Sequence, residues 1–404
     1  MKHDCDPPPE FLLVAACCRW PPSDRRDAAV REAARAVVDW RRFVRVVNRQ
    51  RVAGLVQPAL KAATIALPPD VAAELAQSAQ QIAVQNVQSA GESARLQTIF
   101  DEAHIPIVFF KGVSLAQLAY GSLSLKHSKD IDFLVLPEHA ESALRILEQN
   151  GYALVKPAEH LSRMQRLAYM RHAKEFELLN RTPNIRVELH WHLTDNPLLL
   201  KGVDARSPAR NVVTSGGLPL RTLCEEELFA YLCAHGAVHS WARLKWLADV
   251  NALIANRDDT EIERLFHAAE ARGAGLCAGQ ALLLCDRFWG LKLPPKVEAA
   301  LKKNRRLERL VSTALIAMIG TDAETEILDD RRMQRRIYLT QYLLGRGLSY
   351  FAAQCRIAIV HPEDAVQYPL PLLLDFLYPA LRLPSWIWRH ASGIVASSVA
   401  RKEA

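Results

Sequence analysis

The stretch that decides the fold reads SKDIDFLVL (residues 128–136). Successive side chains of a β-strand point to opposite faces. Asp130 and Asp132 therefore share one face, while Ile131 and Phe133 point the other way, into a core. Two like charges side by side on a strand are destabilising unless something neutralises them. A divalent cation such as Mg²⁺ does so, because it takes carboxylate oxygens as ligands.

A simpler interpretation of the pair competes with a metal site. The two carboxylates can belong to a solvated strand edge, or Asp130 can cap a turn or helix. Taken alone, the pair favours this simpler interpretation. The residues before and after it reverse that preference.

The bulk composition is that of an ordinary globular protein. The chain has 404 residues, half of them hydrophobic, and a formal charge of +7. This length suits two or three domains, or one large domain with helical additions. The mild and dispersed positive charge permits an anionic substrate without requiring nucleic acid.

Cysteine usage and hydropathy bear on the cellular compartment. The eight cysteines form no C-x-x-C pair and no secretory signal precedes them, so we expect thiols in a reducing cytoplasm. No apolar run approaches the roughly 20 residues that span a bilayer. Residues 366–388 are the most apolar segment, but prolines and charges interrupt them. Packing on the protein's own core is the simpler role for this segment, and peripheral contact with a membrane surface or a partner is the alternative.

The pattern along the chain changes from helical to mixed and back to helical. We expect a helical region at 1–104, an α/β core at 105–222, a helical domain closing a cleft at 223–320 and a helical extension at 321–404. Proline at the first helical position predicts a long helix from Pro69. Further expected elements in the core are a buried strand at 105–110, helices at 115–120 and 138–150, and a hairpin of strands 176–179 and 185–191.

Two more pieces of the core carry chemistry. In Lys111-Gly112, glycine lets the backbone approach a ligand closely, and a helix N-terminus attracts phosphate. Glu188 and His190 alternate onto one face of their strand, where a charge is costly to bury without a partner. Three carboxylates on neighbouring strands can hold two metal ions, which clamp the attacking and leaving oxygens of a phosphoryl or nucleotidyl transfer.

The order of these motifs resembles the nucleotidyltransferase superfamily that includes DNA polymerase beta, and more closely a bacterial group of uncharacterised nucleotidyltransferases. The resemblance covers roughly residues 10–320. It rests on Phe110-Lys111-Gly112 with Leu115, Tyr120-Gly121, Lys126, Asp130-Ile131-Asp132-Phe133-Leu134-Val135, Gly151-Tyr152, Glu188-Leu189-His190-Trp191, and His235-Gly236-Ala237 with His239, Trp241, Arg243-Leu244-Lys245-Trp246-Leu247 and Asp249.

This resemblance implies an α+β fold with a polymerase-beta-like mixed sheet and helical flanks. It implies that Asp130, Asp132 and Glu188 bind Mg²⁺ or Mn²⁺ and are catalytic. An NTP such as ATP would be bound by Lys111, Gly112, Ser114, Lys126 and Lys129. The sequence departs from the usual pattern in three places: Val113 separates Gly112 from Ser114, Lys126 stands where arginine is commoner, and Glu188 stands where aspartate is commoner.

Two pairs in the later helices have a structural and a functional interpretation. His235 and His239 share a helix face, and a polar packing role is favoured over a metal role because the glutamate of a His-Glu-x-x-His motif is missing. Lys245 and Asp249 have the spacing of a structural ion pair. Both pairs, like His190, are possible cleft residues.

We therefore expect an enzyme that moves an NMP group from an NTP to an acceptor hydroxyl or phosphate. The acceptor class stays open among small molecules, proteins and tRNA. The alternatives are a toxin-type nucleotidyltransferase acting on tRNA or protein, and a catalytically degenerate copy of the fold that serves as a binding or scaffolding module.

Overall fold

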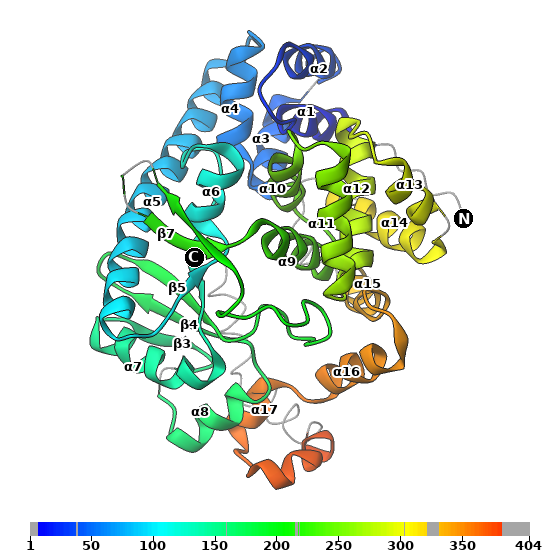
Figure 1. Cartoon of the computed structure of the whole chain (residues 1–404). Helices are drawn as coiled ribbons and strands as arrows, with labels where there is room; N and C mark the ends of the chain where they lie inside the picture. Colours follow the sequence, from blue (N-terminus) through cyan, green and yellow to red (C-terminus); the bar gives the residue numbers. More distant parts are fainter. Residues whose placement is uncertain are drawn as a thin grey trace.

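The computed structural model describes residues 7–37, 39–158, 160–214, 217, 219–302, 304–320 and 331–381. One mixed sheet forms the centre of the α/β part, with helices packed against it (Figure 1). Its strand order is β3-β4-β5-β2-β1-β7-β6. The strands are β1 (Val108–Phe109), β2 (Asp130–Leu134), β3 (Ala153–Lys156), β4 (Glu175–Asn180), β5 (Ile185–His190), β6 (Ala209–Val213) and β7 (Pro219–Leu223). The expected α+β fold is confirmed.

The N-terminal part is helical, as predicted. The long helix α5 begins at Pro69. Proline suits this position because the first residue of a helix makes no intrahelical N–H hydrogen bond, so the missing N–H of proline costs nothing there. It runs for 34 residues and passes beside the sheet (Figure 1). The helices before it are α1 (Pro9–Cys17), α2 (Asp24–Ala34), α3 (Trp40–Gln50) and α4 (Ala53–Ala62), and α5 ends at Glu102.

The middle of the chain confirms most of the predicted elements. The Asp-x-Asp strand is β2, and the predicted hairpin is β4 and β5, which pair antiparallel. Strand β1 is shorter than predicted, and β3, β6 and β7 were missed, because short strands bounded by polar residues have little hydrophobic periodicity. The helices of this part are α6 (Gly112–Tyr120), η1 (Pro137–His139), α7 (Ala140–Gln149) and α8 (Arg163–Met170).

The chain is helical again after β7. No described helix is both long enough and apolar enough for a membrane crossing. Two parts of the predicted C-terminal extension, 321–330 and 382–404, lie outside the described residues. Cys5 also lies outside them, and the other cysteines are free thiols. The helices are α9 (Glu225–Val238), α10 (Leu244–Ile254), α11 (Asp259–Ala271), α12 (Gly275–Trp289), α13 (Pro295–Lys302), α14 (Arg305–Ile319), α15 (Arg331–Thr340), η3 (Gln341–Leu343), α16 (Gly347–Ile359), α17 (Pro362–Gln367) and η4 (Leu372–Leu377).

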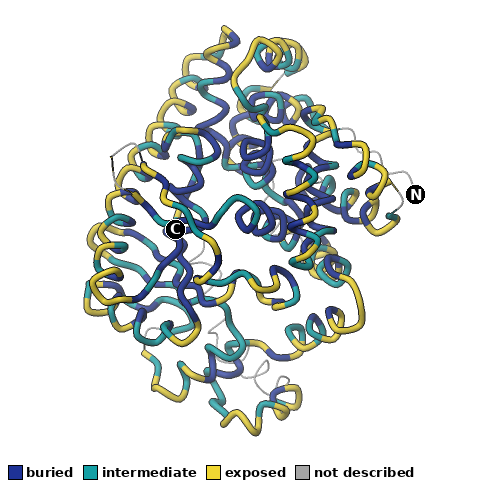
Figure 2. Tube along the Cα trace, in the orientation of Figure 1, coloured by how far each residue is buried: buried dark blue, intermediate teal, exposed yellow. Residues whose placement is uncertain are grey.

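Two large hydrophobic cores lie on opposite faces of the sheet, and the inner strands are buried (Figure 2). Ile131 and Phe133 point into the core shared with α5 and α7. Leu134 points into the other core, which contains α1–α4 together with α9, α10 and α12. Because side chains alternate along β2, Asp132 lies on the same face as Leu134. The carboxylates thus point toward the helical part of the molecule.

Candidate functional site

Strand register brings the predicted acidic residues together. Strands β2 and β5 are parallel neighbours, and Asp132 lies directly opposite Glu188. Asp130 lies one step away, opposite Arg186. Neighbouring strands are about 4.8 Å apart, so side chains in one register row touch or nearly touch. On the far side of β5, the same row continues with Glu177 of β4.

Asp132 is the most buried carboxylate of the site, with 2 % of its surface exposed. Its Oδ1 accepts a hydrogen bond from Lys111 Nζ at 2.8 Å and lies 3.5 Å from His190 Nε2. Burial opposes ionisation, but Lys111 and His190 hold the pKa of Asp132 well below its usual range. The second oxygen, Oδ2, is buried and has no hydrogen-bond partner. Asp132 therefore has one oxygen free for a ligand.

His190 contacts carboxylates of three strands, β2, β4 and β5. Its Nε2 lies 3.3 Å from Glu188 Oε2, and its Nδ1 lies 3.3 Å from Glu175 Oε2. Lys174 Nζ in turn contacts Glu175 at 2.6 Å. Burial alone would lower the pKa of His190, but Glu175, Asp132 and Glu188 raise it to about 9. These carboxylates thus favour the protonated imidazole, and binding of a metal ion through Nε2 would displace that proton.

Among the described residues, one cluster has the geometry to hold a metal ion. It consists of Asp132, Glu188 and His190, whose ligand atoms all lie within 4.8 Å of one another. The sequence predicted Asp130 in place of His190. Burial and the nearby Asp132 raise the pKa of Glu188 to about 7, and they also raise the pKa of Asp130. These raised values show carboxylates crowded together, which a divalent cation would relieve.

The Lys111-Gly112 turn lies at the end of β1 and begins α6. Gly112 has a φ of +60°, a left-handed conformation that glycine adopts without steric cost. No side chain caps the helix N-terminus. Ser114 is fully buried and its hydroxyl donates to the Lys111 carbonyl at 2.9 Å, so it is already engaged. Of the predicted nucleotide-binding residues here, Lys111 and Gly112 are the ones placed beside Asp132.

A small pocket adjoins this turn and contains two residues that the sequence reasoning missed. Ser89 and Ser93 of α5 line it together with Gly112, Asp130 and Asp132. The hydroxyl of Ser93 is buried and has no hydrogen-bond partner. The two serines are one helical turn apart, so they lie on the same face of α5, which is otherwise packed with apolar residues. Two polar residues at this spacing on an apolar helix face are the sequence pattern that indicates them.

Lys126 and Asp249 form a buried pair between the α6–β2 loop and α10. Lys126 Nζ contacts Asp249 Oδ2 at 2.8 Å, and the Tyr120 hydroxyl donates to Oδ1 at 3.0 Å. The partner of Asp249 is thus Lys126, and the prediction that Asp249 pairs with Lys245 is wrong. Burial and the nearby Lys126 lower the pKa of Lys245 to about 7. Lys129, in the same loop as Lys126, is exposed.

Of the predicted histidines, His235 lies on α9, which faces the carboxylates, and His239 directly follows the last residue of that helix. Tyr231 lies between them and the site, with its ring 5.7 Å from Lys111 Nζ. The hydroxyl of Tyr231 is 3.5 Å from His235 Nδ1, and the His235 ring is 4.8 Å from the His239 ring. Neither histidine belongs to the metal-type cluster of the described residues. The packing role predicted for the pair fits these contacts.

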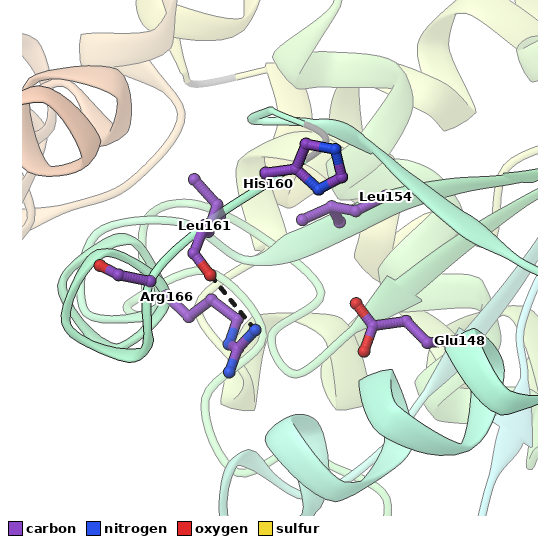
Figure 3. Close-up of a pocket in the computed structure, with 6 residues that line it drawn as sticks. Glu148, Leu154, His160, Leu161 and Arg166 are labelled. Carbon is purple, nitrogen blue, oxygen red and sulfur yellow. Dashed lines mark hydrogen bonds between the residues drawn. The ribbon is translucent and has the colours of Figure 1, made fainter.

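Another pocket lies at a distance from this chemistry, around β3, α7 and the start of α8 (Figure 3). Glu148 and Arg166 are among its lining residues, and the Arg166 guanidinium donates to the Leu161 carbonyl at 3.4 Å. None of the predicted catalytic or nucleotide-binding residues lines it. The carboxylate cluster on β2 and β5 is therefore the candidate active site.

Comparison with known proteins agrees with this geometry. No curated protein matches the chain. Residues 36–290, more than half of the chain, match a family described as uncharacterised nucleotidyltransferase. This span runs from α3 to the end of α12 and includes β2, β5 and the Lys111-Gly112 turn. The chain belongs to this uncharacterised nucleotidyltransferase family.

Proposed function

We propose that the protein is a metal-dependent nucleotidyltransferase that moves an NMP group from an NTP to an acceptor hydroxyl or phosphate. The observation that supports this most is the register of β2 and β5, which places Asp132 directly opposite Glu188. The family match supports the class of reaction.

The residues present fit a divalent cation. Asp132 Oδ2 is a buried oxygen without a partner, and Glu188 and Asp130 supply further carboxylates on the same face. Carboxylate-rich sites suit Mg²⁺ and Mn²⁺, and the imidazole of His190 fits Mn²⁺ better than Mg²⁺. When bound, such an ion would polarise the phosphoryl group and orient the reacting oxygens.

The chain's own residues would position the substrates and balance charge. In the proposed transfer, an acceptor oxygen forms a bond to the α-phosphorus, and the bond from that phosphorus to the β-phosphate oxygen breaks. Pyrophosphate leaves with the bonding electrons, and the acceptor proton passes to solvent. Lys111 lies within hydrogen-bond distance of Asp132, where its ammonium would offset the charge of the phosphates. The open N-terminus of α6 would contribute N–H donors.

The test compares carboxamide variants of the acidic residues. Asp132→Asn and Glu188→Gln should each lower transfer from radiolabelled NTPs by more than about 100-fold, because even residues that only orient metal ligands contribute about 10- to 100-fold. Glu138→Gln is the control, since Glu138 is exposed and its partner is the exposed Arg206. Each variant is checked for wild-type circular dichroism.

The acceptor is sought by incubating the wild-type protein with each labelled NTP, Mg²⁺ or Mn²⁺ and a cell extract. If Asp132→Asn transferred nucleotide at the wild-type rate, the assignment of the site would be overturned. A wild-type protein that binds no NTP in calorimetry with either metal would instead support the binding or scaffolding module.

A further inference from the structure

A row of rings runs from the carboxylate site along α9 to the start of α10. Consecutive ring centroids in this row are 4.8 to 5.7 Å apart. The first rings pack edge to face and the last two are stacked with an interplanar angle of 27°. In order, the rings belong to His190, Phe110, Tyr231, His235, His239 and Trp246.

The two ends of this row differ in exposure. Phe110 and Tyr231 are buried beside the carboxylates, whereas His239 is exposed and Trp246 is partly exposed. Within the described part of the chain, no hydrogen bond to the His239 ring is found, and the ring is held by its contacts with His235 and Trp246. The outer end of the row thus presents stacked rings without a polar partner.

The turn between α9 and α10 fixes these rings in place. Ser240 and Trp241 both have positive φ values, +48° and +53°, which cost about 1–3 kcal/mol each for residues with a Cβ. The buried Trp241 ring packs against Gly236, where any Cβ would collide with the indole. This packing holds the turn, and with it His239 and Trp246, in a strained but defined geometry. Such strain is typical of functional sites.

Cations surround the outer end of the row. Arg243 and Lys245 both precede Trp246 in the chain, at the start of α10, which no side chain caps. The Leu244 N–H donates to Gln50 Oε1 at 2.7 Å, and Arg51 is the next residue in the chain. Arg51 and Asp130 are among the charges that act on Lys245. The row of ring contacts connects Trp246 to His190 of the carboxylate cluster.

We propose that Trp246 and His239 form a stacking surface for the nucleobase of the NTP, and that Arg243 and Lys245 contact the phosphates of the same ligand. This inference rests on the proposed function. The site has aromatic and cationic groups next to each other. A nucleotide, which has both a planar base and phosphates, can contact both kinds of group at once. A ligand with only a ring or only phosphates can contact one kind. Stacking tolerates every base, because each has a π-face. The surface would therefore discriminate weakly among the four bases.

The experiment separates the base from the phosphates. Calorimetry measures the affinity of NTP analogues with a methylene group between the α- and β-phosphorus atoms, and of inorganic tripolyphosphate, which has no base. Trp246→Ala should weaken binding of the analogues by about 10- to 100-fold, the range given by one stacked base, and leave tripolyphosphate binding unchanged. Trp246→Phe should retain most of the affinity. Trp40→Ala, in the Trp40–Phe43 contact of α3, is the control.

Each other result overturns the inference. If Trp246→Ala binds the analogues with wild-type affinity, Trp246 does not hold the base. The same conclusion follows if the variant loses as much affinity for tripolyphosphate as for the analogues. Equal wild-type affinity for analogue and tripolyphosphate would exclude any base contact. If Trp246→Ala does not fold, His239→Ala decides, because His239 is exposed and its removal should still weaken analogue binding alone. A wild-type protein that binds neither probe would refute the proposed function as well.

Discussion

Replacing Lys126 by methionine should destabilise the protein by about 3–5 kcal/mol, the usual cost of leaving one partner of a buried ion pair uncompensated. Only 8 % of the Lys126 side chain and 4 % of the Asp249 side chain are exposed, so solvent screens neither charge. The Lys126 ammonium, 2.8 Å from Asp249, is the cation in contact with that carboxylate. The Tyr120 hydroxyl also depends on Asp249 as an acceptor.

A double variant isolates the interaction. In Lys126→Met/Asp249→Asn both charges are gone, while the asparagine oxygen can still accept the Tyr120 hydrogen bond. Most of the lost stability should return, giving a coupling energy of at least about 2 kcal/mol. Urea titrations followed by circular dichroism measure all the variants. Lys129→Met is the matched control, since the exposed Lys129 lies in the same loop and should change stability by less than about 0.5 kcal/mol.

The result also separates two roles for Lys126. In one outcome, the free energy of unfolding of Lys126→Met is within about 1 kcal/mol of the wild-type value while its affinity for NTP is lost. The ion pair is then not structural, and the sequence-based assignment of Lys126 to nucleotide binding is favoured. A large loss of stability that Asp249→Asn restores identifies the pair as a structural link between the α6–β2 loop and α10.

Two further predictions concern packing and pH. Gly236→Ala should lower stability by about 1–3 kcal/mol, because its Cβ would collide with the Trp241 ring. Gly91→Ala on α5, where no atom of a neighbouring element lies within 4 Å of the new Cβ, should instead raise stability by about 0.5–1 kcal/mol. Thermal melts measure both variants. Equal effects of Gly236→Ala and Gly91→Ala would contradict the close packing of Trp241 on Gly236. Burial and neighbouring Lys126 and Arg51 lower the pKa of Lys245 to about 7, so its ammonium loses a proton as pH rises through that value. Tripolyphosphate affinity should therefore fall across this pH range in the wild type, with proton uptake on binding, and should fall less in Lys245→Arg; identical pH profiles would exclude Lys245 from the phosphate site.

The sequence predicted the parts of the fold that depend on local periodicity. The alternation of Asp130, Ile131, Asp132 and Phe133 predicted which side of β2 is polar, and the structure has Ile131 and Phe133 in the core. Proline at position 69 predicted the start of α5. Strands β3, β6 and β7 were missed because short strands are stabilised by their neighbours in the sheet rather than by their own pattern.

The composition of the site depended on contacts that no local pattern contains. The sequence by itself determined that Asp132 and Glu188 are carboxylates on strands, each with its polar face specified by a period of two. Only the pairing of β2 with β5 placed Asp132 opposite Glu188 and Asp130 opposite Arg186. Only the approach of Lys111 and His190 to Asp132 Oδ1 made it possible to bury that charge. Strand register and long-range ion pairs join residues distant in sequence, so tertiary structure decided which predicted residues form the site.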